Sequence, residues 1–394
     1  MLETLENQPA DKIIALIAQF AADPRTDKVD LGVGVYKDAE GRTPVMRAVK
    51  AAERRLLDAQ TTKSYVALLG DSAFNEAMAD LVLGADRPRD RIAMSQQVGG
   101  TGAVRQLFDL ARRANPDVTV WLPDPTWPNH AAILKGTGIP FRAHRYFDPA
   151  TRGVDFDGMM ADLRGMKAGD VLLLHGCCHN PTGANLTLAQ WDALADLLAE
   201  TGAIPMVDLA YQGFGDGLEE DAAGLRRLAA RCPEFLLAAS CSKNFGLYRD
   251  RVGLSLVIAR NAAEADRARQ NLSALNRLSF SFPPDHGAKV VEIILNDPEL
   301  RADWKAELEG MRSGMLEMRQ AFAEALRRAT NSDRFDFITR HRGMFSLLGA
   351  TPEQVQRIRD EHGIYMVGDS RINVAGLPAK GLDRLAAAIA ASGF

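Results

Sequence analysis

The stretch that decides the fold is Phe235-Leu236-Leu237-Ala238-Ala239-Ser240-Cys241-Ser242-Lys243-Asn244-Phe245-Gly246-Leu247-Tyr248, which Arg251 closes. Its first five residues form an apolar run bounded by polar residues, as in a strand buried within a sheet. Lys243 then lies at the carboxyl end of that strand, where open α/β sheets bind their ligands. A lysine held there near a second cation such as Arg251 loses its preference for the charged form and can attack a carbonyl at neutral pH. A surface lysine in a loop is the alternative that this segment alone leaves open.

Outward from this segment, short apolar runs alternate with helical stretches between about residues 90 and 260. The runs are nearly continuous in apolar character, which indicates parallel strands covered by helices on both faces. The predicted strands are residues 92–95, 118–121, 171–175, 204–209, 235–239 and 253–258. The predicted helices among them include residues 104–113, 188–200 and 223–231. The sequence therefore predicts an α/β fold built around a large, mostly parallel sheet.

The two ends of the chain have a different character. At the N-terminal end, residues 10–22 and 45–60 have the pattern of helices, and residues 31–35 that of a strand. After the sheet region comes a long helical run, residues 298–329, followed by short predicted strands near residues 335–338, 344–348 and 371–374. We expect residues 44–310 to form the large domain, residues 1–43 to form an arm and part of a smaller α+β domain, and residues 311–394 to complete that domain.

Composition limits the class of protein. The chain has 394 residues, 46% hydrophobic and 25% charged, which is typical of a soluble globular protein with room for two domains. A net charge of -4 without a basic block suggests no nucleic-acid partner. The chain shows no signal-peptide pattern at its start and no run of eighteen apolar residues, so we expect a cytoplasmic protein that does not bind membranes.

The four cysteines include the adjacent pair Cys177 and Cys178, which His175 and His179 bracket. Adjacent cysteines suit neither a disulfide framework nor the spacing of a zinc site. We expect all four cysteines to be small buried residues and no metal to be required; metal binding at this cluster is a minor alternative.

A glycine-rich segment precedes the predicted helix at residues 104–113. Gly99, Gly100, Thr101 and Gly102 would present bare backbone amides at a helix N-terminus, which is a site for a phosphate group. A tight turn is an equally simple interpretation of these glycines. A dinucleotide site is not indicated, because the spaced glycine motif and the acidic residue that should follow it are missing.

Other loops after predicted strands carry polar or aromatic side chains. Asp208 ends one strand, with Tyr211 close behind it, while Asn180 and Trp127 follow other strands. Taken singly, they could be a cap, an Asx turn and a core aromatic. Together with Lys243 and the glycine-rich segment, they offer a carboxylate, a phenol, an amide, an aromatic plate, a phosphate cradle and a nucleophile. Pyridoxal phosphate requires this set of groups.

In these motifs the chain resembles the aspartate and aromatic-amino-acid aminotransferases, which are class I, fold type I pyridoxal-phosphate enzymes. The resemblance extends over essentially the whole length. The segments that carry it are residues 31–36, 99–102, 125–130, 175–183, 208–214, 240–251 and 371–376. It implies a seven-stranded, mostly parallel sheet flanked by helices in the large domain, with the smaller α+β domain beside it in the chain.

The resemblance also implies roles for particular residues. Lys243 would be the Schiff-base residue and proton carrier, Asp208 would keep the pyridine nitrogen protonated, and Tyr211 would bond the phenolate oxygen. The residues implied to contact the cofactor are Gly100, Thr101, Gly102, Trp127, Asn180, Asp208, Tyr211, Ser240, Lys243, Arg251 and, from a neighbouring subunit, Tyr65. The resemblance thus implies a homodimer with shared active sites.

Substrate recognition is implied for two arginines. Arg371 corresponds to the residue that grips the α-carboxylate in a bidentate pair, with Gly34, Asn180 and Asn129 nearby in the family's site. Arg277 corresponds to the partner-chain residue that takes the side-chain carboxylate of aspartate or glutamate; a plain helix-end arginine is the alternative.

The resemblance leaves several activities open. Ser64 and Phe282 make the pocket mouth less polar than in aspartate-specific members, which favours an aromatic aminotransferase that also accepts dicarboxylates. A dedicated aspartate aminotransferase is the main alternative. A β-lyase on the same scaffold is disfavoured by Arg277, and a pyridoxal-binding regulator is disfavoured because no DNA-binding module is seen ahead of the aminotransferase segments.

Overall fold

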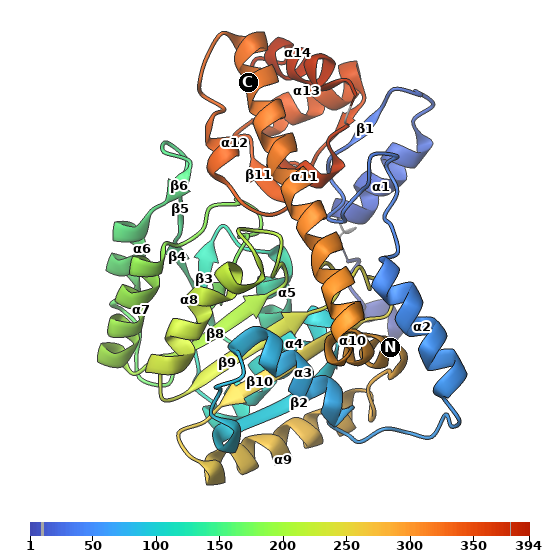
Figure 1. Ribbon diagram of the computed structural model, residues 1–394. Helices are drawn as coiled ribbons and strands as arrows, with labels where there is room; N and C mark the ends of the chain where they lie inside the picture. Colours follow the sequence, from blue (N-terminus) through green and yellow to red (C-terminus); the bar gives the residue numbers. More distant parts are fainter. Residues whose placement is uncertain (9–11, 379) are drawn as a thin grey trace. The chain divides into compact units, whose positions relative to one another are not determined.

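The computed structural model describes residues 1–8, 12–378 and 380–394 (Figure 1). The chain divides into two compact units: Met1–Thr43 together with Met315–Phe394, and Pro44–Gly314. The boundary in the second half of the chain lies within the 33-residue helix α11, Pro298–Thr330. The expected domain boundary at residue 310 lies in the same helix.

The larger unit is built on a seven-stranded sheet with the order β2-β10-β9-β8-β7-β3-β4. Its strands are β2 (Ile92–Val98), β3 (Val120–Asp124), β4 (Phe141–Arg145), β7 (Val171–His175), β8 (Ile204–Leu209), β9 (Phe235–Ser240) and β10 (Val252–Ile258). A two-stranded hairpin, β5 (Phe147–Asp148) with β6 (Gly153–Val154), follows β4 in the sequence. This arrangement confirms the predicted α/β class and the mostly parallel seven-stranded sheet.

One strand runs against the expected direction. Strands β9, β8, β7, β3 and β4 pair in parallel, but β10 pairs antiparallel with both β9 and β2. The prediction that the strand at residues 253–258 is parallel to its neighbours is therefore wrong. The physical reason is that no helix lies between β9 and β10 along the chain, and a parallel pair needs a long crossover connection.

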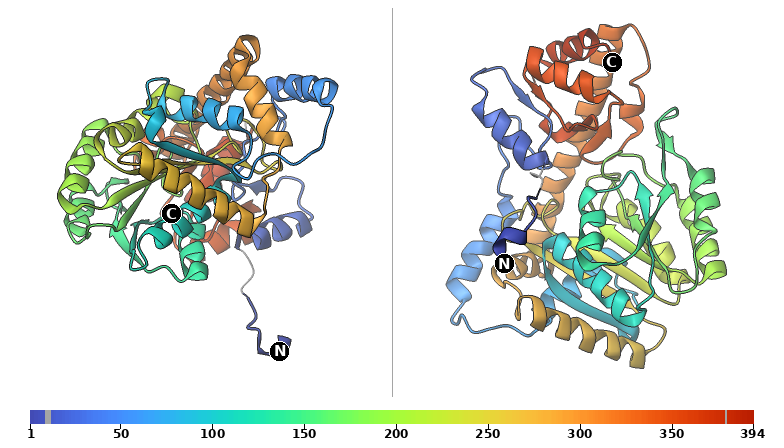
Figure 2. Two further views of the ribbon diagram at one scale, coloured as in Figure 1. Left: turned by 90° about the horizontal axis from the view of Figure 1, so that it is seen from below. Right: turned by 180° about the vertical axis from the view of Figure 1, so that it is seen from behind.

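Helices cover both faces of this sheet (Figure 2). On one face, α4 and α9 enclose an apolar cluster with the strands that includes Phe108, Leu173 and Leu272. On the other face, α8 reaches Gly176, where an added Cβ would lie 3.5 Å from Leu225. The helices of this unit are α2 (Arg47–Ala59), α3 (Ser72–Leu83), α4 (Gly99–Ala114), α5 (Pro128–Thr137), α6 (Phe156–Leu163), α7 (Leu188–Thr201), α8 (Leu218–Arg231), α9 (Ala262–Ser279) and α10 (His286–Asn296).

Local sequence signals fix where these helices begin and end. The capping box of Thr187 and Gln190 starts α7, and Gly202, with a φ of +72°, ends it in the left-handed conformation. Pro128 occupies the first turn of α5, where its missing N–H costs nothing. Among the described helices, none combines the length and the apolar character that a membrane span requires.

The smaller unit contains two short sheets, β1 (Val29–Asp30) with β12 (Ile364–Tyr365) and β11 (Phe345–Leu347) with β13 (Arg371–Asn373). An apolar cluster that includes Leu31, Phe322 and Ile389 forms its core. Its helices are α1 (Lys12–Ala22), the end of α11, α12 (Phe337–Arg340), α13 (Pro352–His362) and α14 (Leu382–Ala391). Residues 10 and 11 of the first predicted helix lie outside the described residues.

Two strand predictions in this unit are wrong. Residues 31–35 form a loop, because Asp30 Oδ1 accepts bonds from the amides of Gly32 and Val33, and Asn373 Nδ2 donates to the carbonyls of Val33 and Val35. Residues 335–338 lead into the short helix α12, since an apolar run of this length does not by itself distinguish strand from helix.

Candidate active site

Lys243 follows the carboxyl end of β9 within the larger unit. The strand ends at Ser240, and the Lys243 Nζ lies 4.8 Å from the centre of the Tyr211 ring. Burial lowers the pKa of the Lys243 amine to about 8, with the charge of Arg251 acting in the same direction and that of Asp208 opposing it. A substantial fraction of the amine is therefore neutral near physiological pH, as a nucleophile or a proton carrier needs.

Asp208 is part of a hydrogen-bonded network of buried and partly buried side chains. Its Oδ2 lies 3.0 Å from His130 Nε2, and His130 Nδ1 lies 2.9 Å from Thr126 Oγ1. The same hydroxyl lies 3.0 Å from His175 Nε2, and His175 Nδ1 accepts the backbone amide of Asn180 at 3.4 Å. Asp208 lies in β8, one residue before the end of the strand, close to the strand end that the sequence predicts. These hydrogen bonds connect the carboxyl ends of β3, β7 and β8.

The surroundings of Asp208 and His175 shift the pKa values of both side chains. Burial raises the pKa of the Asp208 carboxyl, but the hydrogen bond from His130 and the charges of His130, His175 and Lys243 outweigh it, and the pKa is lowered overall. Burial lowers the pKa of His175 to about 3, and His130 adds to the effect. These surroundings favour the ionised form of Asp208 and the neutral form of His175.

Aromatic and amide groups surround these residues. The Trp127 ring meets His130 edge-on, with ring centres 5.1 Å apart, so it lies beside the partner of Asp208. Tyr211 and Asn180 are buried. Asn129 lies in the first turn of α5, next to Trp127, and is partly buried. The structure thus brings Lys243, Asp208 and Tyr211 together and links Trp127 and Asn180 to Asp208 through the histidines.

The glycine-rich segment forms the N-terminus of α4, as predicted, although the helix begins at Gly99 and includes the glycines. The N-cap residue Val98 supplies no capping side chain, so the first amides of α4, which include those of Gly100, Thr101 and Gly102, have no side-chain acceptor at the cap. Gly99 has a φ of +69°, and a Cβ there would lie 2.5 Å from Arg251 Nη2. Only glycine allows the guanidinium to approach this closely.

Serine hydroxyls complete this corner. Gly100 packs against Ser240, since a Cβ on the glycine would lie 3.4 Å from Ser240 Oγ. Arg251 Nη1 lies 3.5 Å from Ser242 Oγ and donates to the carbonyl of Tyr248 at 3.0 Å. A guanidinium, two hydroxyls and free helix amides form a set of donors that fits a phosphate group. The residues present therefore fit pyridoxal phosphate at both its ring nitrogen and its phosphate.

Arg371 and Gly34 belong to the smaller unit, where they share one neighbour. Arg371 is buried, its Nη2 donates to the carbonyl of Gly32 at 3.2 Å, and its guanidinium lies 4.4 Å from the centre of the Phe345 ring. A Cβ at Gly34 would lie 3.1 Å from Phe345 Cζ. The aromatic ring thus supports both predicted carboxylate-binding positions.

Arg277 and Tyr65 form an exposed cluster with Phe282. The Tyr65 side chain is 84% exposed and stacks on Phe282 with ring centres 4.7 Å apart. Arg277 Nη1 donates to Ser281 Oγ at 3.3 Å, and its guanidinium lies 5.9 Å from the centre of the Phe282 ring. Within the described part of the chain, no carboxylate pairs with Arg277.

Sequence reasoning missed two features. The sequence gives no signal for the role of His130, because its contact with Asp208 is made in three dimensions only. Sequence reasoning also missed Asn276, which is 1% exposed. Asn276 Oδ1 accepts from Gln97 Nε2 at 2.8 Å and Gln106 Nε2 at 2.6 Å, and its Nδ2 donates to the carbonyl of Leu68 at 2.7 Å and Ser95 Oγ at 2.9 Å.

The cysteine pair lies close to an acidic residue. Ligand atoms of Cys177, Cys178 and Asp221 are all within 4.8 Å of one another. A hydrogen bond to Cys178 and burial raise the pKa of the Cys177 thiol well above its usual value, which disfavours the thiolate that a metal needs. Asp221 already accepts the backbone amides of Gly213, Gly215 and Asp216. These contacts stabilise a buried loop without requiring an ion.

Fold and site together define a class of protein. The family model described as "Aminotransferase class I and II" matches residues 26–389. The chain belongs to this family, and it is a pyridoxal-phosphate-dependent aminotransferase.

Its relatives include more than one kind of aminotransferase. An aromatic-amino-acid aminotransferase of Paracoccus denitrificans is 59% identical over 389 residues, which cover 99% of each chain. An aspartate aminotransferase of Escherichia coli is 44% identical over 394 residues, covering 99% of this chain and 100% of the relative. A solved structure of an aromatic amino acid aminotransferase with 3-indolebutyric acid matches all of both chains with a TM-score of 0.98 and 59% identity.

Proposed function

We propose that this protein transfers the amino group of phenylalanine, tyrosine and tryptophan, and of aspartate and glutamate, to a 2-oxo acid such as 2-oxoglutarate. The observation that carries the proposal is the 59% identity over 99% of the chain with an aromatic-amino-acid aminotransferase. The aspartate aminotransferase is more distant, at 44% identity. We also propose that the reaction takes place in the cytoplasm, as the sequence predicts.

Two groups of residues would hold the cofactor, one at the N-terminus of α4 and one around Asp208. The amides of Gly100, Thr101 and Gly102, with Ser240 and Arg251, would hold the phosphate, while Trp127 would cover the ring and Asn180 and Tyr211 would bond its oxygen. When bound, pyridoxal phosphate supplies an electron sink for the Cα of the amino acid. Asp208, kept ionised by His130, would hold a proton on the ring nitrogen.

Lys243 would do the proton work. The pKa of its amine is lowered to about 8, so the amine can take a proton from the substrate Cα and return one to the adjacent carbon. The Tyr211 ring lies 4.8 Å from the Lys243 Nζ, which limits where the amine can move. A base that is held in a fixed position transfers protons faster than a base that must diffuse to the substrate from solution.

Substrate selection would fall to the arginines. Arg371 would bind the α-carboxylate, assisted by Gly34 and Asn129, since a guanidinium can pair with both oxygens. Arg277 and Tyr65 would act in the site of a second subunit, and their exposure in the single chain supports this arrangement. We therefore propose that the enzyme is a homodimer.

A single-turnover experiment tests the proposed specificity. The cofactor-loaded enzyme is mixed separately with phenylalanine, tyrosine and aspartate, and loss of the visible absorption of the bound cofactor is followed. Rapid loss with all three amino acids is expected. Loss with aspartate alone would make the protein a dedicated aspartate aminotransferase, and release of ammonia from serine or cysteine would favour a β-lyase.

A further inference from the structure

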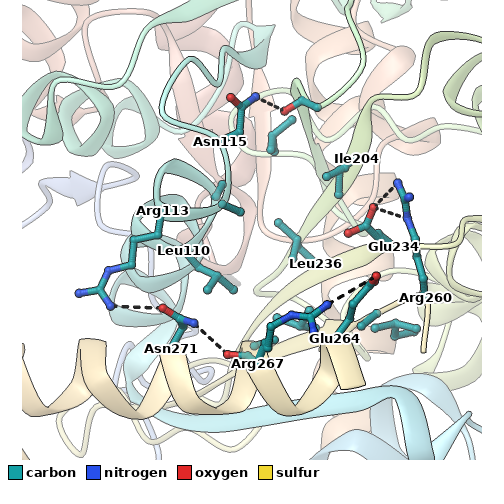
Figure 3. Close-up of a pocket in the computed structure, with 18 of the residues that line it drawn as sticks. Leu110, Arg113, Asn115, Ile204, Glu234, Leu236, Arg260, Glu264, Arg267 and Asn271 are labelled. Carbon is teal, nitrogen blue, oxygen red and sulfur yellow. Dashed lines mark hydrogen bonds and ion pairs between the residues drawn. The ribbon is translucent and has the colours of Figure 1, made fainter. Parts of the chain in front are cut away.

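A cavity lies in the larger unit, away from Lys243. It has a volume of about 580 Å³ and lies between α4 and α9, at the amino ends of β7, β8 and β9 (Figure 3). Lys243 and Asn180 follow the opposite, carboxyl ends of these strands. From Leu236 in the cavity to Ser240 near the phosphate corner, β9 spans roughly 13 Å of extended chain. The cavity is therefore separate from the candidate active site.

The floor of the cavity is apolar. Leu110, Leu236 and Val257 line it and keep 9%, 8% and 7% of their surface exposed, whereas the neighbouring Leu237 is fully buried. A volume of this size lies in the range of small-molecule sites, which bury most of a ligand against apolar side chains. The floor would thus bind the apolar body of a small molecule.

The rim of the cavity carries three arginines and two glutamates. Figure 3 shows the two ion pairs that the glutamates form with two of the arginines. Arg260 Nη2 lies 2.8 Å from Glu234, and Arg267 Nη2 lies 3.8 Å from Glu264. Arg113 makes only a 3.5 Å contact with Asn271 Oδ1, and no carboxylate of the described residues pairs with it. One cation at the mouth of the cavity is therefore left without an ionic partner.

We propose that this cavity binds a small apolar monocarboxylate, with a ring or alkyl chain on the floor and the carboxylate on Arg113. A guanidinium forms its strongest hydrogen bonds with a carboxylate, which would displace the long contact with Asn271. A zwitterionic amino acid fits less well, because both rim glutamates already have arginine partners. A phosphate ester fits less well too, because only one arginine lacks such a pairing.

The probe is 4-phenylbutyrate, titrated into the cofactor-loaded enzyme by calorimetry. Arg113→Ala should weaken one binding event about tenfold. Ala114→Trp, which places an indole in the cavity from the end of α4, should abolish the same event. The matched control is Arg112→Ala, because Arg112 is the neighbouring exposed arginine on α4 but does not line the cavity; its isotherm should equal that of the wild type.

Two further measurements complete the test. Turnover with aspartate should be unchanged in all three variants. Unchanged turnover would show that the variants fold and that the weakened or abolished binding of 4-phenylbutyrate takes place outside the active site. The neutral 4-phenylbutyramide should bind the wild type about as weakly as the acid binds Arg113→Ala. Identical isotherms for the wild type, Arg113→Ala and Ala114→Trp would overturn the proposal, since the probe would then bind elsewhere.

Discussion

The cluster around Lys243 and the cluster around Arg277 are built in opposite ways. Lys243 and Asp208 lie among buried partners, and the Asp208 carboxylate is held by His130 at 3.0 Å. Arg277 and Tyr65 are exposed, and their described contacts are one serine hydroxyl and one aromatic ring. Burial changes the pKa of Lys243, whereas exposure leaves Arg277 free to meet a ligand.

The difference suits the proposed division between chemistry at Lys243 and substrate selectivity at Arg277. Proton transfer needs groups held within a fraction of an ångström, and buried hydrogen bonds provide that constraint. Selecting between a ring and a carboxylate needs a residue whose contacts can change from one substrate to the next. We therefore expect substitutions in the buried cluster to reduce activity toward every substrate, and substitutions in the exposed cluster to act on one class only.

The largest effect is expected for Lys243→Ala. Without the amine, the substrate Cα loses its proton acceptor, so turnover should fall by at least about 10⁴-fold with phenylalanine and aspartate alike. Single-turnover kinetics with both amino acids measures the loss. Full turnover by the variant would show that Lys243 is not the proton carrier.

Asp208→Asn is expected to come next, with a loss of about 10²- to 10³-fold for both substrates, because the amide keeps the shape but loses the charge. The control is Asp170→Asn. Asp170 is also buried, and it accepts Trp121 Nε1 at 2.9 Å at the other end of the sheet. If both variants lose activity equally, the effect of Asp208 is structural and not electrostatic.

Much of the buried cluster could be predicted from the sequence, because Lys243, Asp208 and Asn180 follow or end apolar runs, and the carboxyl ends of parallel strands meet at one edge. The role of His130 could not be predicted, because its partner Asp208 is distant in sequence and nothing in either local segment indicates the contact. The direction of β10 was missed for a related reason. An apolar run specifies a buried strand but not its neighbours' orientation.

The exposed cluster should respond selectively. Arg277→Leu is expected to lower kcat/KM for aspartate by about 10²-fold and for phenylalanine by less than about threefold, because only the dicarboxylate loses a charged partner. Steady-state kinetics with the two donors gives both values. Equal losses would contradict the comparison, since Arg277 would then not contact the substrate side chain.

The partly buried Lys243 should also carry a cost in stability that depends on pH. Its folded-state pKa of about 8 lies below the ordinary 10.5, so the charged amine destabilises the fold fully below pH 8, and the cost disappears as pH rises through 8 toward 10.5. Lys243→Met should therefore stabilise the cofactor-free protein at pH 7 by up to about 3 kcal/mol. Denaturant titrations at pH 7 and pH 10 test this: the gain should shrink at pH 10, and a constant gain would point to packing alone.

The smallest effect concerns Asn276, which joins the two kinds of region. It bonds Gln97 and Gln106 in the buried core, immediately precedes Arg277, and donates to Leu68 in the segment that carries Tyr65. Asn276→Ala should raise the KM for aspartate about threefold to tenfold while changing kcat less than twofold, because the exposed cluster loses its anchor and the buried site does not. Ser95→Ala is the control: it removes one hydroxyl from the same network but leaves the bond to Leu68, so the KM should stay at the wild-type value. An equal rise in KM for both variants would mean that the network only stabilises the core, and the link between buried framework and exposed selectivity would be lost.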